Sequence, residues 1–177
     1  MDISRLPTPC PVIDLSVMRS NIAAMAAVHP GKSLRPHVKA HKCSAIAAEQ
    51  VVAGHTTFTC ATPREILGLV AAGVGEDILL ANETVDPARL AALADAQSSA
   101  LITVAVDSLE TIQAASSAGI RNVLIDVNVG LPRCGCSPEQ AGSPADAARS
   151  LGLIVRGVMG YEGHLMMLTD RQKKQDK

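Results

Sequence analysis

Aromatic residues are almost absent from this sequence, which has Phe58 and Tyr161 and no tryptophan. Aliphatic side chains must therefore build any hydrophobic core, and the chain has enough of them, since 47% of its residues are hydrophobic. With 19% charged residues, this composition indicates a folded chain and excludes a disordered one. A length of 177 residues gives room for one ordinary domain or for part of a larger one.

The chain also lacks an excess of charge of one sign. Its 16 basic and 17 acidic residues leave a formal charge of −1, which gives no support to nucleic-acid binding or to a role at a membrane surface. No apolar run is long enough to cross a bilayer, and no signal peptide is recognisable at the N-terminus. The five cysteines are odd in number and scattered, which is typical of reduced thiols in a cytoplasmic protein.

What the sequence does contain is an alternation of short apolar runs with alanine-rich helical patterns. We expect strands at 34–39, 56–60, 77–81, 101–106, 122–128 and 153–159. A first helix is expected at about 16–28, and later helices have start signals. These signals are Thr62-Pro63, Asp86-Pro87, Asp107 with Glu110, and Ser137-Pro138. Strands separated by single helices predict right-handed βα units and a parallel α/β sheet.

Two α/β architectures fit this alternation, an open doubly wound sheet and a (β/α)8 TIM-type barrel. A doubly wound nucleotide-binding sheet needs a glycine-rich turn after its first strand, and none occurs here. A barrel places functional residues at the carboxyl ends of its strands. The unusual polar residues follow the expected strands in that way: Lys39, His41, Asn82, Asp107, Asp126, Asn128, Arg133, Tyr161 and His164. We therefore expect a barrel, incomplete, with about six βα units.

The first expected strand, "LRPHVKAHK", is unusually rich in cations. If it is extended, its side chains alternate between two faces. One face would hold Leu34, Val38 and Ala40, and the other Arg35, His37, Lys39 and His41. The second face is either a solvated basic strand or a site built around an anion at the barrel mouth. Pro36 weighs against regular pairing of a central strand.

Four ordered motifs resemble one enzyme family over almost the whole chain. They are "TPCPVIDLSVMRSNIAAM", "LRPHVKAHK" with the following "CATPREILGLVAAGVGEDILLAN", "IDVNVGLPRCG" and "GVMGYEGH". Together they resemble the fold-type III pyridoxal-phosphate enzymes of the D-threonine aldolase and D-serine dehydratase group. These enzymes are relatives of the alanine racemase N-terminal domain.

The resemblance implies roles for individual residues. Lys39 would bind pyridoxal 5′-phosphate (PLP) through its amine, and Arg133 would lie near the phenolic oxygen of the cofactor. Tyr161 and His164 would lie against or beside the pyridine ring, and His41 would contact the substrate. Structural alternatives stay open: Tyr161 as a packed aromatic, His164 as a loop histidine, and Arg133 as a helix cap. A zinc site from His37, His41 and Cys43 is a further alternative, although no fourth ligand is evident.

The function implied is that of a PLP-dependent lyase acting on D-β-hydroxy-α-amino acids, either an aldolase or a dehydratase. A racemase of the same fold and a non-catalytic remnant that binds PLP are the alternatives. The family resemblance also implies a divalent metal, manganese or zinc, whose ligands lie in a C-terminal β-domain that is absent from residues 1–177. We accordingly expect a partial barrel that is inactive alone, and a homodimer when the protein is full length.

Overall fold

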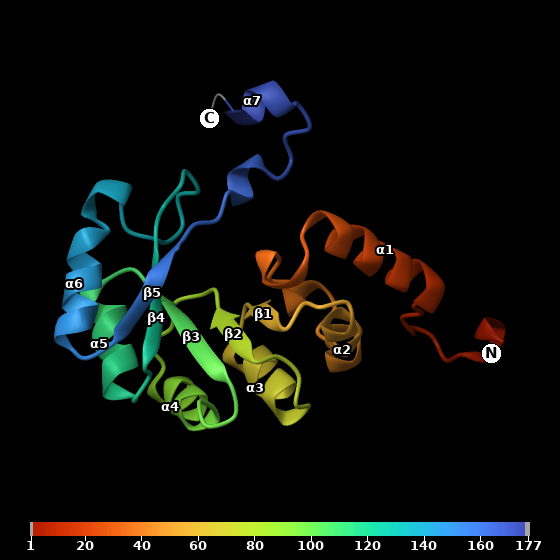
Figure 1. The fold of residues 1–177 in the computed structure, drawn as a ribbon, viewed down its shortest axis with the longest axis horizontal. Helices are drawn as coiled ribbons and strands as arrows, with labels where there is room; N and C mark the ends of the chain where they lie inside the picture. Colours follow the sequence, from red (N-terminus) through yellow and green to blue (C-terminus); the bar gives the residue numbers. More distant parts are fainter. Residues whose placement is uncertain (1, 176–177) are drawn as a thin grey trace.

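The computed structural model describes residues 2–175, which contain one parallel five-stranded sheet (Figure 1). The strands are β1 (Thr57–Cys60), β2 (Asp77–Leu80), β3 (Leu101–Val106), β4 (Asn122–Asp126) and β5 (Ile154–Met159). Their spatial order is β1-β2-β3-β4-β5, the same as their order in the chain. A doubly wound sheet reverses direction at a switch point, whereas this sheet never does. The α/β barrel prediction is confirmed, and the barrel is incomplete.

Helices precede, separate and follow these strands. They are α1 (Leu15–Val28), α2 (Ser44–Val52), α3 (Pro63–Ala71), α4 (Pro87–Ala96), α5 (Leu109–Ser117), α6 (Gly142–Ser150) and α7 (Arg171–Gln175). Helices α3 to α6 line one side of the sheet, while α7 lies away from it (Figure 1).

The predicted helix starts are partly confirmed. Thr62 and Asp86 each accept a hydrogen bond from a backbone N–H three residues on, which satisfies a donor that the helix leaves free. The third cap is Ser108, in a capping box with Thr111, and not Asp107. Ser137-Pro138 begins a 3-10 turn, Pro138–Gln140, and α6 starts later.

Alternate residues of β1 to β4 form the hydrophobic core against the helices. This face of the sheet carries Phe58, Cys60, Ile78, Leu80, Ile102, Val104, Val106, Val123 and Ile125. Phe58 is fully buried there and is the one aromatic residue of the core. Because side chains in a strand alternate between faces, the neighbouring residues of these strands point into the concave side of the sheet, where polar groups such as Asp77 and Thr103 are found.

The strand predicted at 34–39 is wrong. The segment has a single parallel bridge, between His37 and Thr59, followed by a 3-10 turn at Val38–Ala40. Pro36 has no N–H to donate, although its carbonyl accepts from the Thr59 N–H at 2.8 Å. The His37 ring accepts from the Lys39 backbone N–H at 3.2 Å. The alternating cationic face therefore does not form.

Arg35 instead joins an ion cluster on the concave side of the sheet. Its guanidinium contacts both carboxylate oxygens of Asp77, at 3.1 and 3.0 Å. Arg156 from β5 contacts the same two oxygens, at 2.9 and 2.8 Å, and also the Thr103 hydroxyl. Burial raises the pKa of Asp77, but the hydrogen bonds from Arg156 and Arg35 outweigh it and lower the pKa to about 2. This cluster ties the segment before β1 to β2, β3 and β5.

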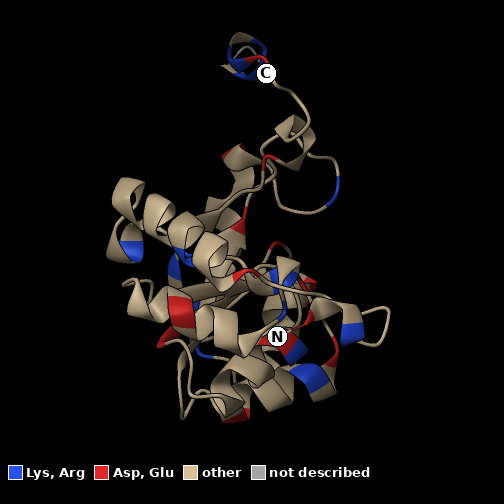
Figure 2. Ribbon diagram, turned by 90° about the vertical axis from the view of Figure 1, so that its right-hand side faces the viewer, with Lys and Arg blue, Asp and Glu red and all other residues tan. Residues whose placement is uncertain are grey.

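The remaining surface features agree with the composition. Figure 2 shows basic and acidic residues interspersed along the ribbon. Within residues 2–175, no helix has the length and apolar character needed to span a membrane. All five cysteines are free thiols.

We expect Asp77→Asn to lower the free energy of unfolding by about 2 kcal/mol near neutral pH, because it leaves two partly buried arginines without their carboxylate. The pKa of Asp77 is lower in the folded than in the unfolded chain. Its contribution is therefore complete above an unfolded pKa of about 4 and is lost as the pH falls toward the folded value of about 2. Denaturant unfolding at several pH values measures this.

Asp95→Asn is the matched control, since Asp95 is an exposed residue of α4. It should leave stability unchanged. Equal stability of the Asp77→Asn and Asp95→Asn chains at neutral pH would contradict the role of the cluster.

Candidate functional site

Three of the predicted site residues meet at the rim where the strands end. The Lys39 amine lies 5.2 Å from the centroid of the Tyr161 ring, and the Arg133 guanidinium carbon lies 5.4 Å from it. Both distances are within the range of about 6 Å over which an aromatic ring attracts a cation. Lys39 comes from the 3-10 turn before α2, Arg133 from the loop after β4, and Tyr161 from the segment after β5. Parallel strand direction brings these three segments to one rim.

The loop that carries Arg133 is closed at its base by backbone hydrogen bonds. The Cys136 N–H donates to the Asp126 carbonyl at 3.0 Å, and the Asn128 N–H donates to the Cys136 carbonyl at 2.9 Å. Gly135 makes this closure possible, because its φ is +95° and an added Cβ would lie 2.6 Å from the Asn128 nitrogen. Its N–H also donates to Asp107 at 3.0 Å. The position of Arg133 is thus set by a short closed loop.

His164 packs against the same loop. A Cβ added to Gly130 would lie 2.8 Å from the His164 ring, so the ring occupies the space that the missing side chain leaves. The His164 Nδ1 is buried and has no hydrogen-bond partner among the described residues. A buried nitrogen without a partner is costly, so the rim has a polar group beside the Arg133 loop that could bind a ligand.

His41 lies toward α2. Its Nδ1 accepts from the Cys43 backbone N–H at 3.1 Å, and its Nε2 is buried. Burial lowers the pKa of His41, while the hydrogen bond with the Cys43 backbone acts in the opposite direction. A contact of His41 with substrate stays a prediction. The alternative zinc site gains no support, because His37, His41 and Cys43 do not form a group of close ligand atoms within the described part of the chain.

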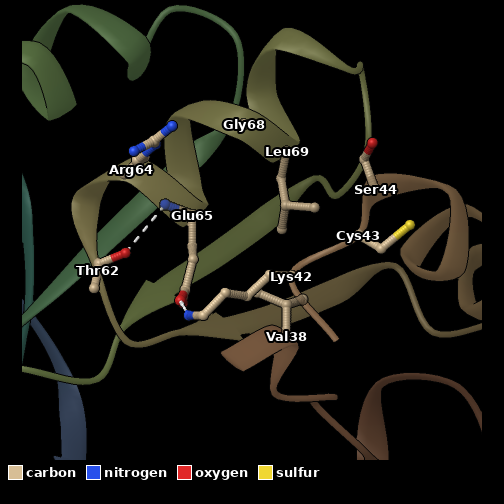
Figure 3. Close-up of a pocket in the computed structure, with 9 residues that line it drawn as sticks. All are labelled: Val38, Lys42, Cys43, Ser44, Thr62, Arg64, Glu65, Gly68 and Leu69. Carbon is tan, nitrogen blue, oxygen red and sulfur yellow. Dashed lines mark hydrogen bonds and ion pairs between the residues drawn. The ribbon is translucent and has the colours of Figure 1, made fainter. Parts of the chain in front are cut away.

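A pocket of about 510 Å³ lies between the first turns of α2 and α3 (Figure 3). Lys42 reaches across it to the Glu65 carboxylate (Figure 3), and the other Glu65 oxygen accepts from the Ala61 N–H at 2.7 Å. Lys39, Arg133 and Tyr161 do not line this pocket. The two lysines of the "HVKAHK" motif are therefore separated, and Lys42 is engaged in an ion pair.

Sequence reasoning missed one residue of the rim, Glu83, which follows β2. One carboxylate oxygen of Glu83, one of Asp126 and the Cys134 sulfur all lie within 4.8 Å of one another. Burial and a hydrogen bond with Asp126 raise the pKa of Glu83. Burial also raises the pKa of the Cys134 thiol, to about 11. A strand end followed by an acidic residue is the only sequence signal for Glu83, and the "ANETVDP" segment has no spacing that singles it out.

The family model for the alanine racemase N-terminal domain matches residues 13–176. The chain belongs to this family. The assignment agrees with the predicted resemblance and with the sequential parallel sheet.

Individual relatives of the alanine racemase N-terminal domain family were found by sequence and by structure. A D-threonine aldolase of Arthrobacter sp is 36% identical over 97% of this chain and 48% of its own length. A 3-hydroxy-D-aspartate aldolase of Paracoccus denitrificans is 30% identical, over 99% and 49%. The crystal structure of D-threonine aldolase from Filomicrobium marinum superposes with a TM-score of 0.89 at 31% identity, over 98% and 49%. The chain thus spans about half the length of these relatives.

We expect Gly130→Ala to destabilise the chain by about 1–3 kcal/mol, because a side chain at a φ of +116° is strained and would strike the His164 ring. The His164 ring resonances should move in an NMR spectrum. Gly142→Ala is the matched control: Gly142 begins α6 and has nothing within 4 Å of an added Cβ. A Gly130→Ala chain with unchanged melting temperature and His164 resonances would show that the close packing is absent.

Proposed function

We propose that this chain carries the PLP-binding half of a lyase that cleaves D-β-hydroxy-α-amino acids. The observation that carries the proposal is the stack of Lys39, Tyr161 and Arg133 at the carboxyl ends of the strands. The names of the relatives, which include a D-threonine aldolase and a D-threo-3-hydroxyaspartate dehydratase, supply the substrate class.

The environment of Lys39 supports its role as the cofactor lysine. Lys42 is paired with Glu65, and Lys32 with Glu76. Among the described residues no carboxylate lies within ion-pair distance of the Lys39 amine, and its neighbour is the Tyr161 ring. An amine that is not held by a carboxylate is free to react with a carbonyl carbon. Lys39 is also anchored at its backbone, which donates to the His37 ring.

The other residues of the rim fit an anionic aromatic ligand. PLP, when bound, supplies an electron sink for the bond that breaks at Cα of the amino acid. Arg133 offers a permanent positive charge to an oxygen anion on the ring. The unsatisfied His164 Nδ1 is available to a polar group of the ligand, and the Tyr161 ring offers an aromatic surface for packing. These residues bind and orient the ligand.

Several finer features of this function remain proposals. The broken bond is Cα–Cβ in an aldolase, giving glycine and an aldehyde, and the β-hydroxyl leaves in a dehydratase. A divalent metal at the β-hydroxyl, a homodimer and a cytoplasmic location belong to the same proposal. So do the remaining barrel strands and a C-terminal β-domain.

Borohydride reduction of the PLP-loaded chain, followed by peptide mapping, tests the lysine. We expect the label on Lys39, because Lys42 and Lys32 are held by carboxylates. Lys39→Met should abolish the label, and Lys32→Met, the matched control, should retain it. A label on Lys32 or Lys42 would overturn the assignment.

A second experiment concerns the arginine. Arg133→Leu should shift the absorbance of bound PLP and weaken its retention by about tenfold, the worth of one hydrogen bond to a charged group. Equilibrium dialysis and absorption spectra measure both effects. Arg121→Leu, at an exposed position before β4, is the control. An unchanged spectrum and affinity in the Arg133→Leu chain would leave this arginine with a structural role only.

A further inference from the structure

Two acidic side chains and one thiol lie next to Arg133, and the proposed function gives them no role. Glu83, Asp126 and Cys134 come from the loop after β2, the end of β4 and the loop after β4. One carboxylate oxygen of each acid and the Cys134 sulfur lie within 4.8 Å of one another, and Asp126 is 5% exposed. Two carboxylates at this separation in a poorly hydrated site cannot both hold their charge without a strong partner.

Cys134 accepts one hydrogen bond and donates another. The Arg133 Nε–H donates to the Cys134 sulfur at 3.5 Å, and the Cys134 thiol donates to Asp126 Oδ2 at 3.4 Å. The thiol keeps its proton, because burial raises its pKa to about 11. Asp126 is therefore the acceptor of this hydrogen bond. The order of donors runs from Arg133 through Cys134 to Asp126.

Of the two carboxyl groups, that of Glu83 has the surroundings that favour the protonated form. Its Oε1 is buried and has no hydrogen-bond partner among the described residues. An ionised oxygen in that position would lose its hydration without compensation, whereas the carbonyl oxygen of a neutral acid loses much less. Burial and the hydrogen bond with Asp126 raise the pKa of Glu83 and outweigh a hydrogen bond with Cys134 that lowers it.

The charged and titratable groups that face this pair are few. Arg133, Cys134 and Cys136 come from the loop after β4, and Asp107 from the end of β3. The Asp107 carboxylate is occupied by the Gly135 N–H at 3.0 Å. The Cys136 thiol donates to the Asp126 carbonyl at 3.3 Å. Arg133 is the cation of the set, so the pair and Arg133 are electrostatically matched when the pair has one negative charge.

We propose that Glu83 and Asp126 share one proton, and that the single negative charge of this pair positions Arg133 against Tyr161 through the Cys134 thiol. The inference rests on the proposed function for the use of Arg133 toward a cofactor, but the proton and the contact with Tyr161 belong to the chain alone. Glu83 and Asp126 are positioning residues, because they act on Arg133 through Cys134. Ionisation of Glu83 adds a second negative charge and disturbs the position of Arg133.

Tyr161 provides a site-specific probe, because it is the only tyrosine and there is no tryptophan. Its near-ultraviolet circular dichroism reports how Arg133 and Lys39 lie on its ring. The carboxyl carbon of Glu83, followed by NMR in ¹³C-labelled protein, reports the proton. Both are measured on the cofactor-free 177-residue chain after dialysis against a chelator.

We expect Glu83 to titrate above the pH of an ordinary glutamate, and the Tyr161 signal to change over the same pH range. In Glu83→Gln the amide replaces the protonated acid, so the low-pH Tyr161 signal should persist and the transition should vanish. In Asp126→Asn the Tyr161 signal should match that of Arg133→Leu at every pH. Glu139→Gln, at an exposed position outside the cluster, should keep the transition of the unmodified chain.

In the cofactor-free chain, three results would overturn the inference: a Glu83 midpoint at or below the ordinary value, a Tyr161 transition that survives in Glu83→Gln, or one equivalent of zinc held at the cluster after dialysis. With PLP added, Asp126→Asn combined with Arg133→Leu should lose no more cofactor retention than Arg133→Leu alone, since both changes remove one interaction. Additive losses would also contradict it. If PLP does not bind to the unmodified chain, the proposed function fails, and the cofactor-free titration still decides this inference.

Discussion

Parallel hydrogen bonding between consecutive strands is the constraint on which the rest of this structure depends. Each strand pairs with the next one along the chain, so every strand must be followed by a return helix on the same side of the sheet. All carboxyl ends therefore lie at one rim. Segments that are far apart in the sequence, at Lys39, Arg133 and Tyr161, meet there without any contact of their own being needed to fold the chain.

Cationic side chains are stabilised in three different ways around this frame. Arg35 and Arg156 share the Asp77 carboxylate on the concave side of the sheet. Lys42 is held by Glu65 between α2 and α3. Lys39 and Arg133 lie on the Tyr161 ring, where the attraction is weaker than that of a buried carboxylate. Of these five cations, Lys39 and Arg133 are the two without a carboxylate partner anywhere in residues 2–175, and they are the two proposed to act on a ligand.

The two aromatic residues lie in different environments, one in the core and one at the rim. Phe58 fills the core between the sheet and its helices and is fully buried, while Tyr161 is 39% exposed at the rim. Aliphatic residues supply most of the core, since the face of the sheet that packs on the helices is valine, isoleucine and leucine apart from Phe58 and Cys60. The one tyrosine is therefore available for the rim.

Much of this arrangement follows from the sequence by itself. The apolar runs and helix caps predict the strands from β1 to β5 and the order of the units, because burial of alternate side chains and satisfaction of helix ends are local requirements. The motif around Lys39, together with those around Arg133 and Tyr161, also indicates which residues belong to one site. These signals are short in range or are carried by the family resemblance.

Tertiary structure decided the rest. Pro36 and the His37 ring turn the segment before α2 into a bridge and a 3-10 turn, so the alternation expected for Arg35 to His41 does not apply. Asp77 forms ion pairs with Arg35 and Arg156, and Glu65 forms one with Lys42. Glu83 approaches Asp126 and Cys134 from a loop that no spacing connects to them. Ion pairs and shared protons depend on distances between residues remote in the sequence, and only the three-dimensional arrangement of the sheet and its loops fixes those distances.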